Sequence, residues 1–240
     1  MRFWREQAIV WAALLAMSTS SLAASISLAP LDNNDPDPAH AIVFVEGDLR
    51  SGDDIAFRTH VGRLTKAIVA FNSDGGDVLA GIAIGKTIRL KSFATAVLDG
   101  QRCASACAIA WLGGSPRLMG RTASIGFHAA YIKREGRASE SGVGNALVGS
   151  YLTQIGLSET AVVYITQAAP TQLTLLTLQD AERIGIEVLP FEQYASAQRI
   201  DPPPLKWSDV RITPPRNTTR SSRIKQARSV VCERNPLEMV

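Results

Sequence analysis

Residues 101–114 read QRCASACAIAWLGG, a polar stretch that gives way to an apolar run closed by two glycines. Three roles are open to Ser105, which lies between Cys103 and Cys107. A serine before an apolar helix commonly serves as its N-cap. It can also be a nucleophile exposed on a strand–turn–helix connection, or a small residue inside a disulfide loop. Because these roles need different neighbours, the rest of the chain has to decide among them.

Segments with strand and helix patterns alternate on both sides of this stretch. Short runs rich in β-branched and small apolar residues are typical of buried strands, and segments with helical apolar periodicity follow them. Regular alternation of this kind implies parallel pairing in an α/β domain. The expected strands cover 41–47, 67–73, 93–99, one or two short stretches within 115–131, and 186–190. The expected helices cover 51–67 with Ser51 or Asp53 as N-cap, 74–90, 105–114, two helices within 143–168 broken near Gly156, and 177–186 with Thr177 as N-cap.

The first 24 residues have the pattern of an export signal. Arg2 and Arg5 precede ten apolar residues, Ala8 to Met17, and small residues follow up to SLAA. An apolar run of ten is too short for a membrane-spanning helix and fits a secretory signal; an uncleaved anchor or a buried helix is the alternative. We therefore expect a cleaved N-terminal signal peptide and an exported protein, located in a bacterial periplasm.

The remaining chain divides by composition. Residues 25–40 are rich in Pro and Asp and are expected to be a linker, 41–195 to be one domain, and 196–240 to be a disordered Pro/Arg-rich tail. The last 40 residues hold eight Lys/Arg against four Asp/Glu, a net charge of +4. Such a tail is a solvated linker, or a segment that touches anionic lipid or cell-wall polymer.

The net charge of the chain and its few residues suited to bind a metal or a nucleotide argue against several classes of protein. Residues 25–200 carry 15 Lys/Arg against 17 Asp/Glu. This slightly acidic body argues against nucleic acid as the main ligand, because phosphate binding needs clustered positive charge. The three His are scattered, and no Cys/His spacing matches a zinc site. No nucleotide-binding glycine loop is present, so the sequence predicts neither a metal nor a cofactor.

Two further features are candidates for a site. FNSDGGDVLAG at 71–81 places two glycines between an expected strand and an expected helix. Glycines there let backbone N–H groups approach a ligand, and a helix N-terminus favours negative charge; a tight turn without a ligand is the ordinary interpretation. His128, in ASIGFHAAY at 123–131, is either a core histidine or a general base.

The three features gain meaning from their order along the chain. Gly75-Gly76, Ser105 and His128 each lie near the end of an expected strand, so together they can form an acyl-transfer site. In that site Ser105 attacks, His128 accepts its proton, and the N–H groups of Gly76 and Ala106 form an oxyanion hole. Donors of this kind are commonly worth about 3–4 kcal/mol each in the transition state.

The same blocks resemble the signatures of the Clp protease proteolytic-subunit family, in the Clp/crotonase superfamily. NSDGGDVLAG is similar to its N-S-P-G-G stretch, with Asp74 where proline is usual. GQRCASACA is similar to its G-Q-A-A-S-M-G-A stretch, SIGFHAAY to M-I-H-Q-P, and LTLQDAERIGI to L-S-A-x-E-A-x-x-Y-G-L. The resemblance spans about residues 41–190 and implies a single-domain α/β spiral of ββα units. It also implies Ser105 as nucleophile, Ala106 as the second oxyanion donor and His128 as base.

One member of the family's triad is missing. Its aspartate should lie shortly before the last block, but residues 161–179 contain no Asp or Glu. The aspartate holds the histidine tautomer, and its loss can cost orders of magnitude in rate. The chain could use a bare Ser–His dyad, or it could replace the aspartate with Glu159, Asp180, Gln172 or Thr174. Related Ser–Lys peptidases use a lysine base instead, for which Lys133 is the nearest candidate.

Two functions therefore stay open. The first is an exported ClpP-like serine hydrolase, a peptidase that cleaves peptides or proteins by Ser–His acyl transfer. The alternative is a catalytically impaired module that binds peptides or protein partners through the retained groove. The resemblance also implies a homo-oligomer, and export implies no ATP-dependent unfoldase partner. An oxidising compartment would permit a Cys103–Cys107 disulfide around Ser105, with two buried thiols as the alternative.

Overall fold

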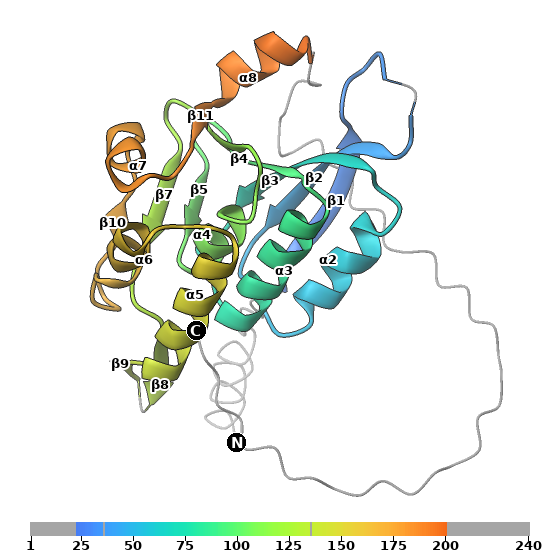
Figure 1. The fold of residues 1–240 in the computed structure, drawn as a ribbon. Coiled ribbons are helices and arrows are strands. Elements are labelled where there is room, and N and C mark those ends of the chain that lie inside the picture. The colour runs from blue at the N-terminus through green and yellow to red at the C-terminus, as the bar shows by residue number, and fades with distance from the viewer. Residues whose placement is uncertain (1–22, 36, 135, 201–240) are drawn as a thin grey trace, which may run out of the picture.

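The structure is a computed structural model that describes residues 23–35, 37–134 and 136–200. The described chain folds into one α/β domain built around two adjoining sheets (Figure 1). The expected signal peptide up to residue 22 and the tail from residue 201 lie outside the described residues. Within the described ranges, no helix is both long enough and apolar enough to cross a membrane.

Six strands form the main sheet, in the order β1-β2-β3-β4-β6-β11. All neighbouring pairs from β2 to β11 are parallel, which confirms the expected class, and β1 pairs antiparallel with β2 at one edge. The strands are β1 (Ser25–Pro30), β2 (His40–Glu46), β3 (Lys66–Asn72), β4 (Ala94–Val97), β6 (Arg117–Met119) and β11 (Leu189–Pro190).

One face of the main sheet carries the larger hydrophobic core. Alternate strand residues such as Val43, Val45 and Val69 point into this core, where they meet apolar side chains of the helices and of the second sheet. Helices α2 and α3 lie side by side against the sheet, and α4 and α5 follow along it (Figure 1). The helices of this core are α2 (Asp53–Val61), α3 (Val78–Leu90), α4 (Ala106–Trp111), α5 (Gly142–Gln154), α6 (Glu159–Thr166) and α7 (Leu178–Ile184).

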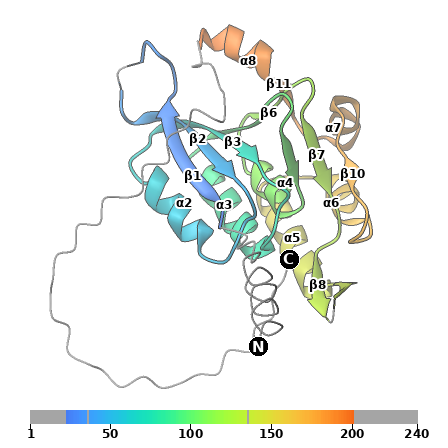
Figure 2. The same ribbon diagram turned by 180° about the vertical axis from the view of Figure 1, so that it is seen from behind.

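A second sheet of three short strands lies against the first. It consists of β5 (Arg102–Ala104), β7 (Ser124–Phe127) and β10 (Thr174–Leu175), in the order β10-β7-β5. An isolated bridge between Ser73, just past β3, and Cys103 in β5 ties the two sheets together. A separate hairpin, β8 (Tyr131–Arg134) and β9 (Arg137–Glu140), projects from the body of the domain (Figure 2). The second sheet carries the candidate site, because Ser105 and His128 directly follow two of its strands.

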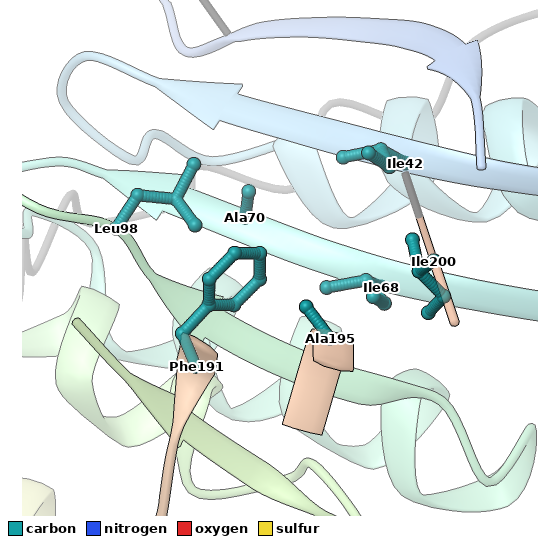
Figure 3. A pocket seen from close by; sticks show the side chains of 7 residues that line it. All are labelled: Ile42, Ile68, Ala70, Leu98, Phe191, Ala195 and Ile200. Atoms are coloured by element: carbon teal, nitrogen blue, oxygen red, sulfur yellow. The ribbon is translucent and has the colours of Figure 1, made fainter. Parts of the chain in front are cut away.

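The other face of the main sheet is covered by the last described helix, α8 (Phe191–Gln198). Phe191 and Ala195 of α8, and Ile200 just after it, lie against apolar side chains of β2 and β3 and against Leu98 just past β4 (Figure 3). The sheet residues of this second core include Ile42, Phe44, Ile68, Ala70, Ala96 and Leu98. No residue of α8 is fully buried, so the helix covers this face without itself becoming part of the interior.

Three boundaries differ from the sequence expectations. Residues 25–30 are not part of a linker: they form β1, because Ile26 and Ala29 pack against the two cores while the backbone pairs with β2. The domain continues past residue 195, since α8 extends to Gln198. The N-cap of α2 is neither Ser51 nor Asp53: Gly52 occupies that position with a left-handed φ of 98°.

Candidate active site

The turn between β5 and α4 presents Ser105. Ser105 is partly exposed, whereas every other residue from Cys103 to Gly114 is buried. Its backbone has φ 54° and ψ −126°, a conformation that non-glycine residues rarely adopt. Strained residues of this kind persist only where the surrounding structure imposes them, and they concentrate at functional sites.

The geometry separates two of the roles left open for Ser105. The residue occupies the N-cap position of α4, but its hydroxyl accepts no capping hydrogen bond and its backbone is outside the extended region that caps adopt. In contrast, Asp77 caps α3 by accepting hydrogen bonds from the N–H groups of Leu79 and Ala80. The strained turn therefore presents the Ser105 hydroxyl without using it to stabilise the helix.

Gly75 and Gly76 pack directly beside this turn. A Cβ on Gly75 would lie 2.6 Å from Cβ of Ser105 and 3.1 Å from the nitrogen of Ala106. A Cβ on Gly76 would overlap the carbonyl oxygen of Leu49. Both glycines have positive φ, 107° and 128°, so neither position accepts a larger residue without displacement. The two glycines allow the turn between β3 and α3 (the glycine turn) to touch the turn between β5 and α4 (the serine turn).

Two backbone N–H groups at this contact have no partner in the described chain. Within those ranges, no hydrogen bond uses the N–H of Gly76 or of Ala106. The neighbouring groups are engaged: Gly75 N–H donates to Oγ of Ser73 at 3.0 Å, and Asp77 N–H donates to the carbonyl of Leu49 at 2.8 Å. Free backbone donors beside a partly exposed serine are the kind of group that an oxyanion hole requires.

The parallel pairing of β5 with β7 places Ser105 and His128 just past the same end of the second sheet. The register aligns Ala104 with Gly126, and the N–H of Ser105 donates to the carbonyl of Gly126 at 2.9 Å. His128 follows two residues after Gly126, and adjacent strands lie about 4.8 Å apart. The backbones at Ser105 and His128 therefore leave neighbouring strands at the same end of the second sheet, and the register continues with Ser105 opposite Phe127, one residue before His128. Within the described residues, no hydrogen bond joins their side chains.

The ring of His128 is held by a backbone carbonyl. Its Nδ1 lies 2.8 Å from the carbonyl oxygen of Ala129. Because a carbonyl can only accept, this contact requires the proton on Nδ1, and Nε2 is then the free acceptor of the neutral ring. The ring also packs against Tyr131, with the centroids 5.4 Å apart. The carbonyl of Ala129 thus fixes the tautomer that the missing aspartate would otherwise fix.

Asp180 and Glu159, the acidic residues considered as replacements for the triad aspartate, form no hydrogen bond or ion pair with His128 within the described residues. Asp180 accepts hydrogen bonds from Arg183 at 2.8 Å and from Thr177 at 2.7 Å, and these bonds lower the pKa of its carboxyl. Glu159 is exposed in the first turn of α6. Lys133, the alternative base, is exposed on the β8–β9 hairpin with its ammonium 5.9 Å from the ring centre of Tyr131.

A cleft of about 260 Å³ opens beside His128. Gln172, one of the two neutral substitutes for the aspartate, shares this cleft, whereas Thr174 lies in β10 opposite Phe127. Asp74 and Arg102 form an exposed ion pair of 3.1 Å at its wall. The lining residues are Asp74, Arg102, Ala104, His128, Pro170, Thr171, Gln172 and Leu173. The cleft is thus open, has a mixed polar and apolar lining, and lies next to the candidate base, while Ser105 is not among its lining residues.

A disulfide joins Cys103 and Cys107, whose Cα atoms are 5.3 Å apart. Both cysteines are buried, and the bond closes a loop of five residues with Ser105 at its centre. Cys103 lies in β5 and Cys107 in the first turn of α4, so the bond ties together the two elements that meet at the serine. The disulfide loop that the sequence left open is thus present around Ser105, and it does not exclude a nucleophile role for this serine.

Sequence reasoning missed three supporting residues. Ser73 joins the glycine turn to β5, because its backbone bonds with Arg102 and Ala104 while its hydroxyl binds Gly75 N–H. Leu49 holds the same turn from the other side, and Ala129 holds the histidine. Ser73 lies within the NSDGG block and could have been singled out there. Leu49 and Ala129 act through backbone atoms, so their residue types give no signal.

Comparisons with known proteins extend this description of the fold. No family model matches the chain, and no curated protein matches it. A serine-to-alanine mutant of the membrane-bound stomatin-specific protease 1510-N matches with a TM-score of 0.50 and 16% identity, over 64% of this chain and 81% of that one. A lysine-to-alanine mutant of the same protease, in complex with a substrate peptide, matches with a TM-score of 0.47 and 19% identity, over 60% and 72%.

At such low identity, the first match shows the fold alone. The chain has an α/β domain with a parallel sheet, similar in fold to the structure of the 1510-N protease. The expected fold class is therefore confirmed.

Proposed function

We propose that this chain is an exported serine peptidase that cleaves peptides or proteins by acyl transfer from substrate to Ser105. The observation that carries the proposal is the contact of His128 Nδ1 with the carbonyl of Ala129. This contact leaves Nε2 free to accept a proton on the strand end next to Ser105. The ClpP-like protease fold agrees with this chemistry.

The proposed reaction uses four groups. Ser105 Oγ attacks the scissile carbonyl while His128 Nε2 takes its proton. The negative oxygen that forms is stabilised by the N–H groups of Gly76 and Ala106. His128 then protonates the leaving amine, and a water molecule activated by the same ring releases the acyl group.

The neutral carbonyl of Ala129 supports only part of what a triad aspartate does. It selects the tautomer and orients the ring, but it carries no full charge to stabilise the imidazolium that forms during attack. We therefore expect turnover that is slower than that of a complete triad yet depends on both Ser105 and His128. This dependence distinguishes the enzyme from the catalytically impaired alternative.

Export and assembly belong to the same proposal. The N-terminal sequence has the pattern of a signal peptide, and the Cys103–Cys107 bond fits an oxidising compartment such as the periplasm, where no ATP-dependent unfoldase would assist. A homo-oligomer is supported by α5, which has no charged residue and exposes Val143 by 67% and Leu147 by 41%. Light scattering that shows a monomer at every concentration would contradict the oligomer.

The proposal is tested with a mixture of peptides of varied sequence, analysed by mass spectrometry after incubation with the purified protein. We expect cleavage products with the parent chain and none with Ser105→Ala. Ser139→Ala, which removes an exposed hydroxyl in β9, is the matched control and should cleave like the parent. Cleavage that survives Ser105→Ala refutes the assigned nucleophile. No cleavage by folded parent protein favours the impaired peptide-binding module.

A further inference from the structure

Asp53 is a buried carboxylate far from the proposed chemistry in sequence. It lies in the first turn of α2 and is 5% exposed. Its Oδ2 accepts hydrogen bonds from the N–H of Arg50 at 2.7 Å and from the nitrogen of Ala24 at 3.1 Å. No ion pair between Asp53 and another described side chain is formed. A carboxylate removed from water without a cation is costly, so a positive charge is expected at one of its two partners.

The nitrogen of Ala24 is the partner that can acquire this charge. In the full-length chain it is a neutral amide. Residues 21–24 read Ser-Leu-Ala-Ala, and the small residues at Ser21 and Ala23 match the small-x-small pattern that precedes an export cleavage. Ala23 is exposed whereas Ala24 is partly buried, so the chain becomes anchored at the Ala23–Ala24 bond.

We propose that a signal peptidase hydrolyses the Ala23–Ala24 bond and that the new α-ammonium of Ala24 forms a buried ion pair with Asp53. The reaction adds one water across the peptide bond. Ala23 keeps the carboxylate and leaves with the signal peptide, and the Ala24 nitrogen takes up protons to become an ammonium. Processing would thus replace a hydrogen bond from a neutral amide to the carboxylate with a hydrogen-bonded ion pair between two charged groups.

The geometry selects this bond over its neighbour. Cleavage after Ala24 would remove the nitrogen that faces Asp53. The next residue, Ser25, already lies in β1 opposite Glu46. Only a chain that begins at Ala24 places its terminal ammonium 3.1 Å from Oδ2 of Asp53.

The ion pair would anchor the loop that holds the glycine turn. Oδ2 of Asp53 binds the N–H of Arg50, and the preceding residue, Leu49, exchanges backbone hydrogen bonds with the glycine turn. Leu49 N–H donates to the carbonyl of Gly75 at 2.6 Å, and its own carbonyl accepts from Asp77. The N-terminus is therefore linked through one loop to the proposed oxyanion hole; only this consequence for the site rests on the proposed function.

The test begins with the chain of residues 1–240 expressed in a bacterium that can export it. Mass spectrometry of the purified product identifies its first residue, which we expect to be Ala24. Thermal unfolding is then compared for the parent, Asp53→Asn and Asp54→Asn. Asp54 is the matched control: it is the adjacent carboxylate of the same turn, partly exposed and 2.8 Å from Arg58. We expect Asp53→Asn to lower the melting temperature by about 10 °C and Asp54→Asn by about 2 °C or less.

A chain that begins one residue earlier, at Ala23, provides the second measurement. In this longer chain the Ala24 nitrogen is an amide. It can donate a hydrogen bond to the carboxylate of Asp53, and it can donate equally to the side-chain amide oxygen of the Asp53→Asn variant. Asp53→Asn should therefore lower the melting temperature of this longer chain by less than half as much as it lowers that of the chain that begins at Ala24. An exported product that begins at any other residue, or equal losses in both chains, overturns the proposal. Unfolding requires no catalysis, so a protein that fails to cleave peptides can still show this pattern.

Discussion

The most informative substitution at the proposed site is Gly75→Ala, which adds one methyl group beside the nucleophile. The new Cβ would lie 2.6 Å from Cβ of Ser105 and 2.7 Å from the carbonyl oxygen of Ala104. Since carbon atoms pack at about 3.5–4.0 Å, Ser105 would have to move by about 1 Å. A misplacement of that size costs on the order of 100-fold in rate. The positive φ of 107° adds strain of roughly 1–3 kcal/mol.

The assay measures the rate at which a fluorophosphonate probe labels the protein, together with its thermal unfolding. We expect labelling to slow about 100-fold while the protein stays folded, with a melting temperature lower by about 5 °C. Gly149→Ala in α5 is the control, because its Cβ would meet Val162 of α6 at an ordinary 3.7 Å. If the probe labels Gly75→Ala at a rate within about threefold of the parent, the contact between the glycine turn and the serine turn does not determine the reactivity of Ser105.

Three further predictions concern the elements that hold the site. Replacing Cys103 and Cys107 together by serine should lower the free energy of unfolding by about 2 kcal/mol, the value for a five-residue loop. The measurement is urea denaturation under oxidising conditions, and an unchanged midpoint would contradict this prediction. Asp77→Ala removes both capping bonds of α3 and should cost about 1–2 kcal/mol in the same assay, whereas no measurable loss would show that the cap is dispensable. Phe191→Ala removes a main contact of α8 with the sheet (Figure 3); we expect faster proteolysis of the chain after residue 190 with little change in probe labelling, and unchanged proteolysis would argue against α8 as a packed cover.

Much of the fold follows from local patterns in the sequence. The apolar runs that form β2, β3 and β4 are continuous because both faces of a parallel sheet are buried, and this property makes them easy to recognise. Thr177 is the expected cap of α7, and its hydroxyl does accept from Asp180 N–H. Gly156 separates α5 from α6, with the left-handed φ of 87° that a helix break there requires.

The remaining features depend on contacts between distant segments. β1 is six residues long and begins a stretch rich in Pro and Asp, so its composition predicts a linker; only pairing with β2 makes it a strand. The strained φ of Ser105 arises from the turn that β5, α4 and Gly75 impose together, not from its own propensity. The partner of His128 could not be found by searching for acidic residues, because it is the carbonyl of Ala129.

Covalent labelling of the folded, oxidised protein with a fluorophosphonate, mapped to a single residue by mass spectrometry, tests the proposed nucleophile most directly. We predict one label per chain on Ser105, background labelling in Ser105→Ala, and a rate lower by about 100-fold or more in His128→Gln, which keeps an amide in place of the base. Absence of labelling in a protein that unfolds cooperatively, or labelling of another serine, would contradict the proposed peptidase site.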